Sequence, residues 1–332
     1  MSNIKIGIIG GGAWGTALGS NLSIKNKNVL LWSRNKKVVN SINESNLNKI
    51  YLPSIKLNKN LRSTNSKEKL RDCDVLIFAV PTQYIRSTLN LFKNIISKKT
   101  IIINCSKGIE RKTLSFPSSI FKEEIPNSPF AILSGPTFAS ELAQDLPSAI
   151  TLACEANLLH NELAKKIPSD SLRFYFSDDI IGVELGGSIK NVIAIAAGII
   201  HGANLGENAR AAIISRGLAE ITRLGIPLGA RTETLMGLSG LGDLILTANS
   251  VKSRNFSLGS AIGQGIKPNE FLSEKNSIAE GLFTTGAAVS LGNKLKVDIP
   301  IIKAVNSILK GEKNLNDTLK EFFLRPLKFE SE

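Results

Sequence analysis

The stretch "IKIGIIGGGAWGTALGSNL", residues 4–22, decides the fold. It begins as a run of β-branched residues, passes through a glycine-rich turn and continues with helical spacing. Gly10, Gly12 and Gly15 have the Gly-x-Gly-x-x-Gly spacing. The first glycine allows a tight turn, the second lets the backbone approach a pyrophosphate, and the third lets helix and strand pack closely. The stretch therefore predicts a dinucleotide site at the N-terminus of a helix.

The same alternation of short apolar runs and helical patterns continues through the first half of the chain. Such a rhythm is typical of βαβ units and of a parallel sheet buried on both faces. We therefore expect an α/β Rossmann-type domain with a mostly parallel sheet over residues 1–178, and an all-α C-terminal domain over residues 179–332, where the strand signal almost disappears. The expected strands are residues 4–10, 29–33, 74–80, 100–105, 129–135, 148–153 and 172–176.

Composition restricts the class of protein. The chain has 332 residues, 42% hydrophobic and 21% charged, which is typical of soluble globular proteins. No uncharged apolar run reaches the roughly 18 residues that span a bilayer, so we expect no membrane insertion. Three separated cysteines indicate a reducing, cytoplasmic location and no cysteine metal site. The net charge of +13 is spread in short pairs, which argues against nucleic-acid binding.

The end of the second expected strand indicates which dinucleotide binds. An NAD-selective site carries Asp or Glu about 20 residues after the glycines, whereas this chain has Ser33, Arg34, Lys36 and Lys37. Cations attract a 2′-phosphate that a carboxylate would repel. NADP(H) is therefore the preferred cofactor, and NAD(H) remains open. An Arg34 that stacks on adenine or faces solvent is the alternative.

Lys190 stands at the head of an apolar helical segment, "IKNVIAIAAGII". Gly186 and Gly187 clear space before it, and Asn191 adds a polar neighbour. Burial lowers the pKa of a lysine and a nearby carboxylate raises it, which can make the side chain a general acid/base. The alternative is a lysine at a helix end that extends to solvent.

Of the two histidines, we expect His160 to be solvated and His201 to have a structural role at a helix end.

Eight motifs resemble one known family in order along the chain, from residue 4 to about residue 310. This is the bacterial and plastid type of NAD(P)-dependent glycerol-3-phosphate dehydrogenase. The motifs are "GGGAWGTAL", "NCSKGIE", "LSGPTFASEL", "LPSAI", "ELGGSIKNVIAIAAG", "NARAAIISRGLAEI", "MGLSGLGDLILT" and "SRNFSLG".

The resemblance implies a reaction and a set of site residues. The reaction is the reversible reduction of dihydroxyacetone phosphate to sn-glycerol 3-phosphate, which supplies the phospholipid backbone. Lys190 matches the catalytic lysine, and Lys107 and Asp243 match catalytic or substrate-site partners. Gly135, Thr137, Ser253, Arg254 and Asn255 match substrate contacts. Cofactor contacts are matched by Gly10, Gly12, Ala13, Trp14, Gly15, Arg34, Lys107, Ala139, Arg254 and Glu280.

Other readings stay open at this point. A β-hydroxyacid or 6-phosphogluconate-type dehydrogenase also joins such domains and uses a lysine, and a nucleotide-sensing regulator would keep the fold without turnover. No His/Cys/Asp cluster has metal-ligand spacing, so we expect no metal. Helical second domains often dimerise, and a homodimer is one expected assembly. The chain end "LRPLKFESE" has no interpretation.

Overall fold

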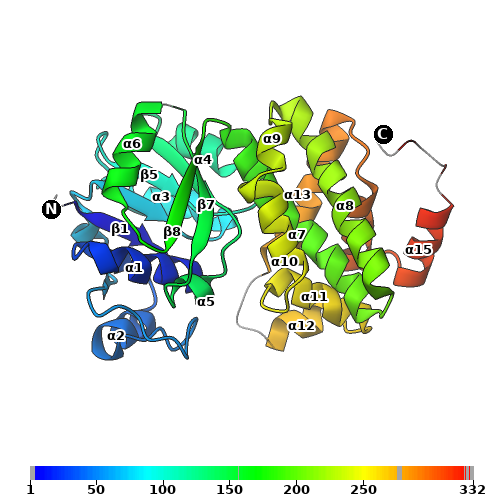
Figure 1. Ribbon diagram of the computed structural model, residues 1–332, viewed down its shortest axis with the longest axis horizontal. Coiled ribbons are helices and arrows are strands. Elements are labelled where there is room, and N and C mark those ends of the chain that lie inside the picture. Colours follow the sequence, from blue (N-terminus) through cyan, green and yellow to red (C-terminus); the bar gives the residue numbers. More distant parts are fainter. Residues whose placement is uncertain (1–3, 156, 275–278, 325, 327–328, 330–332) are drawn as a thin grey trace.

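The computed structural model describes residues 4–155, 157–274, 279–324, 326 and 329. Figure 1 shows a sheet with covering helices, formed by the first half of the chain, beside a bundle of helices formed by the second half. The predicted α/β Rossmann-type region followed by a helical region is therefore confirmed. The uninterpreted chain end lies mostly outside the described residues.

The sheet has eight strands in the order β3-β2-β1-β4-β5-β6-β7-β8. All neighbours run parallel except β6 and β7, which are antiparallel. The order reverses between β1 and β4, and ligands of such sheets bind at this reversal, beyond the carboxyl ends of the strands. The strands are β1 (Ile6–Ile9), β2 (Val29–Trp32), β3 (Arg62–Thr64), β4 (Val75–Phe78), β5 (Ile101–Asn104), β6 (Phe130–Ser134), β7 (Ser148–Ala153) and β8 (Leu172–Ser177).

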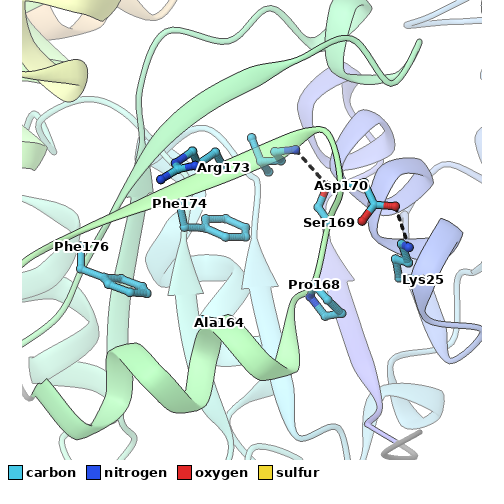
Figure 2. Close-up of a pocket in the computed structure, with 9 residues that line it drawn as sticks. Lys25, Ala164, Pro168, Ser169, Asp170, Arg173, Phe174 and Phe176 are labelled. Atoms are coloured by element: carbon cyan, nitrogen blue, oxygen red, sulfur yellow. Dashed lines mark hydrogen bonds and ion pairs between the residues drawn. The ribbon is translucent and has the colours of Figure 1, made fainter.

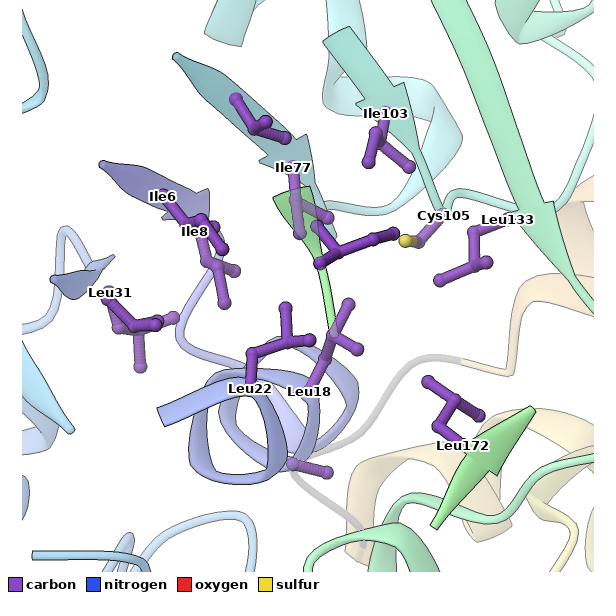
Figure 3. Close-up of a cluster of buried hydrophobic side chains, with 14 of the residues drawn as sticks. Ile6, Ile8, Leu18, Leu22, Leu31, Ile77, Ile103, Cys105, Leu133 and Leu172 are labelled. Carbon is purple, nitrogen blue, oxygen red and sulfur yellow. The ribbon is translucent and has the colours of Figure 1, made fainter. Parts of the chain in front are cut away.

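Helices cover both faces of the sheet, so the central strands are buried throughout. On one face Leu18 and Leu22 of the first helix pack among Ile8, Ile77 and Ile103 (Figure 3). Burying each of these side chains contributes about 1.5–3 kcal/mol. The helices of this region are α1 (Ala13–Lys25), α2 (Lys36–Ser45), α3 (Ile85–Phe92), α4 (Pro117–Glu124), α5 (Ala139–Leu142) and α6 (Asn157–Lys166), with short turns η1 (Lys67–Leu70) and η2 (Thr82–Tyr84).

One long helix, α7 (Ile180–Gly202), forms the centre of the helical region. By length and composition it could cross a membrane, but 89% of its most apolar window is buried inside the protein. It is therefore placed as a core helix. Around it lie α8 (Gly206–Gly225), η3 (Ile226–Leu228), α9 (Thr232–Leu235), the π-helical turn η4 (Leu238–Gly242), α10 (Asp243–Ala248), α11 (Arg254–Gly263), α12 (Pro268–Glu274), α13 (Glu280–Leu295), α14 (Pro300–Lys310) and α15 (Leu315–Phe323).

Glycines bring α7 and α11 into backbone contact. A Cβ at Gly198 would lie 2.2 Å from the carbonyl oxygen of Phe256, and one at Gly259 would lie 2.1 Å from that of Ile195. No side chain fits between the two helices at these points. The close crossing fixes the N-terminus of α11 beside the middle of α7, where Lys190 lies.

The prediction that His160 is solvated is wrong. Its side chain is 7% exposed, its Nε2 lies 3.0 Å from the carbonyl oxygen of Ser177, and its ring stacks on Phe176. The sequence of α6 appeared polar, but the helix packs against β8, which covers this residue. His201 is exposed in the last turn of α7, with its ring 5.3 Å from that of Phe256.

Candidate active site

The glycine turn leaves one side of its backbone open. Gly10 has φ +127°, and a Cβ there would lie 2.4 Å from the carbonyl oxygen of Ala79. A Cβ at Gly15 would lie 2.1 Å from the carbonyl oxygen of Gly10, so α1 touches the turn directly. A Cβ at Gly12 would meet nothing within 4 Å. This free space at the N-terminus of α1 suits a pyrophosphate, because the unpaired backbone N–H groups of a helix start attract anions.

The end of β2 lies against this turn. Ser33 is buried, and its Oγ would be 2.6 Å from a Cβ at Gly11. Arg34, Lys36 and Lys37 are exposed. The cations predicted to select a 2′-phosphate thus follow Ser33 in the chain and are open to solvent.

A second group of charges lies where the two regions meet. Asp243, the first residue of α10, is 1% exposed. Its Oδ1 accepts a hydrogen bond from Nζ of Lys190 on α7, and its Oδ2 accepts one of 2.5 Å from Nζ of Lys107, in the loop after β5. Lys190 also donates to Oγ1 of Thr247 at 2.8 Å. One buried carboxylate therefore holds two ammonium groups, one from each region.

Two glycines of α7 make this meeting sterically feasible. A Cβ at Gly187 would lie 2.7 Å from Oγ of Ser134 and 3.6 Å from the side chain of Lys107. A Cβ at Gly186 would lie 2.9 Å from Cα of Gly240 in η4. Larger residues here would push away the loop that carries Lys107 and the turn that carries Asp243. The space predicted beside Lys190 is used for these two approaches.

Burial lowers the pKa of Lys190 from its ordinary 10.5 to about 8. This value already includes the effect of Asp243, which raises the pKa, and that of Lys107, which lowers it. Burial also raises the pKa of Glu280, at the start of α13, to about 7, against the opposing effect of Arg254, Lys107 and Lys190. A lysine with a pKa near neutral pH can both give and take a proton during turnover.

The "SRN" segment opens α11. Ser253 caps the helix by accepting a hydrogen bond of 3.2 Å from the backbone N–H of Phe256. Arg254 is exposed beside it. Asn255 is buried and bridges helices: its Nδ2 donates to Oδ1 of Asn191 at 2.9 Å, and its Oδ1 accepts from the N–H of Gly281 at 3.0 Å. This helix start offers a guanidinium and backbone N–H groups to an anion.

The "GPTFA" segment lies beside Lys107. The carbonyl oxygen of Gly135 is 3.4 Å from Nζ of Lys107. Thr137 Oγ1 is buried with no hydrogen-bond partner among the described residues, and Ala139 begins α5. Trp14, on α1, is partly buried against the core.

Some predicted residues are grouped and others are not. Lys107, Gly135, Lys190 and Asp243 meet in one cluster, whereas Arg34 lies apart at the end of β2. Thr247 was missed by the sequence reasoning. Its position four residues after Asp243, on the same face of α10, was the available signal.

A cavity of about 430 Å³ lies elsewhere, between α6 and β8 (Figure 2). None of the residues that line it is a predicted site residue. Its one charged pair, Lys25 and Asp170, is already joined at 2.6 Å.

In the described part of the chain, no group of three or more His, Cys, Asp or Glu side chains could hold a metal ion.

Comparison with known proteins agrees with the resemblance seen in the motifs. The family models for the N-terminus and the C-terminus of NAD-dependent glycerol-3-phosphate dehydrogenase match residues 5–159 and 179–320. A relative from Parvibaculum lavamentivorans, named glycerol-3-phosphate dehydrogenase [NAD(P)+], is 42% identical over 98% of both chains. One of the same name from Caulobacter vibrioides is 42% identical over 100% of both chains.

Solved structures give the same assignment. Glycerol-3-phosphate dehydrogenase from Coxiella burnetii has a TM-score of 0.93 at 35% identity, covering 98% of this chain and 100% of the other. A D-mandelate dehydrogenase bound to NADH, at 18% identity and a TM-score of 0.63, shares the fold alone. The chain therefore belongs to the NAD-dependent glycerol-3-phosphate dehydrogenase family.

Proposed function

We propose that this protein catalyses the reversible NAD(P)H-dependent reduction of dihydroxyacetone phosphate to sn-glycerol 3-phosphate, with Lys190 as the general acid/base. The observation that carries the role of Lys190 is its buried ammonium, held by Asp243 opposite Lys107. A carbonyl oxygen that becomes an alcohol needs a proton, and a lysine with a pKa of about 8 can supply it.

The other residues divide the remaining tasks. The open glycine turn and the start of α1 fit a dinucleotide, which when bound supplies the hydride for C2 of the substrate. Lys107 places a second positive charge where the C2 oxygen becomes negative, which stabilises the transition state. Asp243 orients both lysines. Glycerol 3-phosphate made in this way would serve phospholipid synthesis in the cytoplasm. We expect the enzyme to need no metal, and a homodimer is one expected assembly.

The first test is an assay of purified protein with dihydroxyacetone phosphate, following the absorbance of NADPH and of NADH. Oxidation of either cofactor that depends on the substrate supports the proposal. Binding of cofactor without turnover would favour the nucleotide-sensing alternative, and turnover of small hydroxy acids alone would favour a different substrate class.

Replacing Arg254 by alanine is expected to raise the KM for dihydroxyacetone phosphate by about 10- to 100-fold, because a hydrogen bond to a charged group contributes about 1.5–3 kcal/mol. The kcat at saturation should change much less, since the phosphate does not react. Steady-state kinetics measure both, with Arg223→Ala, on α8, as the control. An unchanged KM would remove Arg254 from phosphate binding.

Arg34→Asp is expected to shift the preference from NADPH toward NADH. The new carboxylate repels the 2′-phosphate and can accept hydrogen bonds from the ribose hydroxyls of NADH. We expect the ratio of kcat/KM for NADPH over NADH to fall about 10- to 100-fold, on the scale of one charged hydrogen bond. Lys27→Asp, at an exposed position before β2, is the control. A constant ratio would mean that Arg34 only stacks or faces solvent.

A further inference from the structure

An ion pair joins the two segments that flank the site. Nζ of Lys252 lies 2.8 Å from Oε1 of Glu141, and 5.8 Å from the centre of the Phe138 ring. Lys252 belongs to the helical region and Glu141 to α5, 111 residues earlier in the chain. The contact therefore bridges the two regions.

Each partner is next to residues assigned to the substrate. Lys252 directly precedes Ser253 and Arg254 at the start of α11, and Glu141 follows four residues after Thr137. We propose that Lys252 and Glu141 are positioning residues, which hold Arg254 and the N-terminus of α11 in register with the Thr137 segment and so set the affinity for substrate. This inference rests on the proposed function.

Local hydrogen bonds transmit the contact on both sides. Oγ of Ser257, on α11, donates to the carbonyl oxygen of Val251 at 2.8 Å, and the N–H of Lys252 donates to Oγ of Ser250 at 3.2 Å. On the other side, the N–H of Glu141 donates to the carbonyl oxygen of Phe138 at 3.1 Å. These bonds tie the backbone around Lys252 to α11 and the backbone of Glu141 to Phe138, so the ion pair joins two locally ordered segments.

The expected change in KM is small, because the side chains of the ion pair are exposed to water. The side chains of Lys252 and Glu141 are 57% and 36% exposed, so water weakens their attraction. An exposed pair of this kind changes an equilibrium by roughly two- to fivefold, and salt screens it. Neither residue contacts the reacting atoms, so the effect should appear in KM and leave kcat nearly constant.

Charge reversal tests the proposal. Glu141→Lys and Lys252→Glu, made singly, are each expected to raise the KM for dihydroxyacetone phosphate about two- to fivefold at low salt, with a smaller rise at high salt. The KM for NADPH should change less, because most residues matched to the cofactor lie at the glycine turn and the end of β2, away from this pair. The double variant restores an opposite pair, and its KM should return close to that of the wild type.

The Lys25 and Asp170 pair supplies a matched control, because it is also exposed but lies at the cavity between α6 and β8 (Figure 2). Reversing it should leave both KM values unchanged. Single variants with an unaltered KM, or a double variant whose KM equals the product of the two single effects, would overturn the positioning role. A wild-type protein that does not reduce dihydroxyacetone phosphate would instead reject the proposed function, and the positioning role with it.

Discussion

Replacing Lys190 by alanine is expected to reduce kcat for dihydroxyacetone phosphate by about 10²- to 10⁴-fold, the range that a positioned general acid supplies. The KM for NADPH should change little, because Lys190 lies on α7, away from the glycine turn. The measurement is steady-state kinetics beside Lys303→Ala, an exposed lysine on α14. A Lys190→Ala enzyme with wild-type kcat would exclude Lys190 from proton transfer.

The pH dependence gives a second readout for the same residue. Because the pKa of Lys190 is lowered to about 8, its ammonium form is present below that pH and is lost above it. Reduction needs the proton, so its rate should fall as pH rises through about 8. Oxidation of glycerol 3-phosphate needs the neutral amine and should rise over the same interval.

The alanine variant should lose this titration in both directions. Small primary amines added to it should restore part of the rate, since they can occupy the vacated space and donate a proton. A pH profile that is the same in the wild type and the variant would assign the titration to another group. Glu280 is a candidate, because its pKa is about 7 and its charge interacts with that of Lys190.

Local sequence patterns predicted most of the sheet. The expected strands at residues 4–10, 74–80 and 100–105 contain β1, β4 and β5, because buried parallel strands are continuous apolar runs that can be recognised one by one. Strand β3 was missed. It has only three residues, all of them polar or charged, and its place depends on pairing with β2. A pattern within the segment itself carries no such information.

The cluster of charges could be predicted only in part, for the same reason. The apolar context of Lys190 indicated burial, and the motif resemblance named Asp243 and Lys107. That one carboxylate bridges both lysines depends on contacts over 53 and 136 residues of chain. The bridging role of Asn255 likewise arises from the glycine crossing of α7 and α11, which the "SRN" motif does not reveal.

The Asp243→Asn variant tests that bridge, and it should lose both activity and stability. Without the carboxylate, the group that raises the pKa of Lys190 is gone, while burial and Lys107 continue to lower it. A larger share of Lys190 should then be neutral at pH 7, and the amine also loses the carboxylate that orients it, so kcat for reduction should fall by about 10²-fold or more. The residual activity of the variant should have its optimum at a lower pH than that of the wild type, because a more acidic solution is needed to protonate the amine of Lys190.

The loss of stability in this variant should be moderate, because the lowered pKa of Lys190 lets the buried amine lose its charge. Removing one partner of a buried ion pair costs about 3–5 kcal/mol when the other charge remains. Lys190 can release its proton, which leaves an imperfectly paired amine and a cost closer to the ~1–3 kcal/mol of an unsatisfied buried polar group. Denaturant unfolding at pH 7 measures this, with the exposed Asp178→Asn as the control. A variant with wild-type kcat and an unshifted pH optimum would show that Asp243 does not govern the protonation of Lys190.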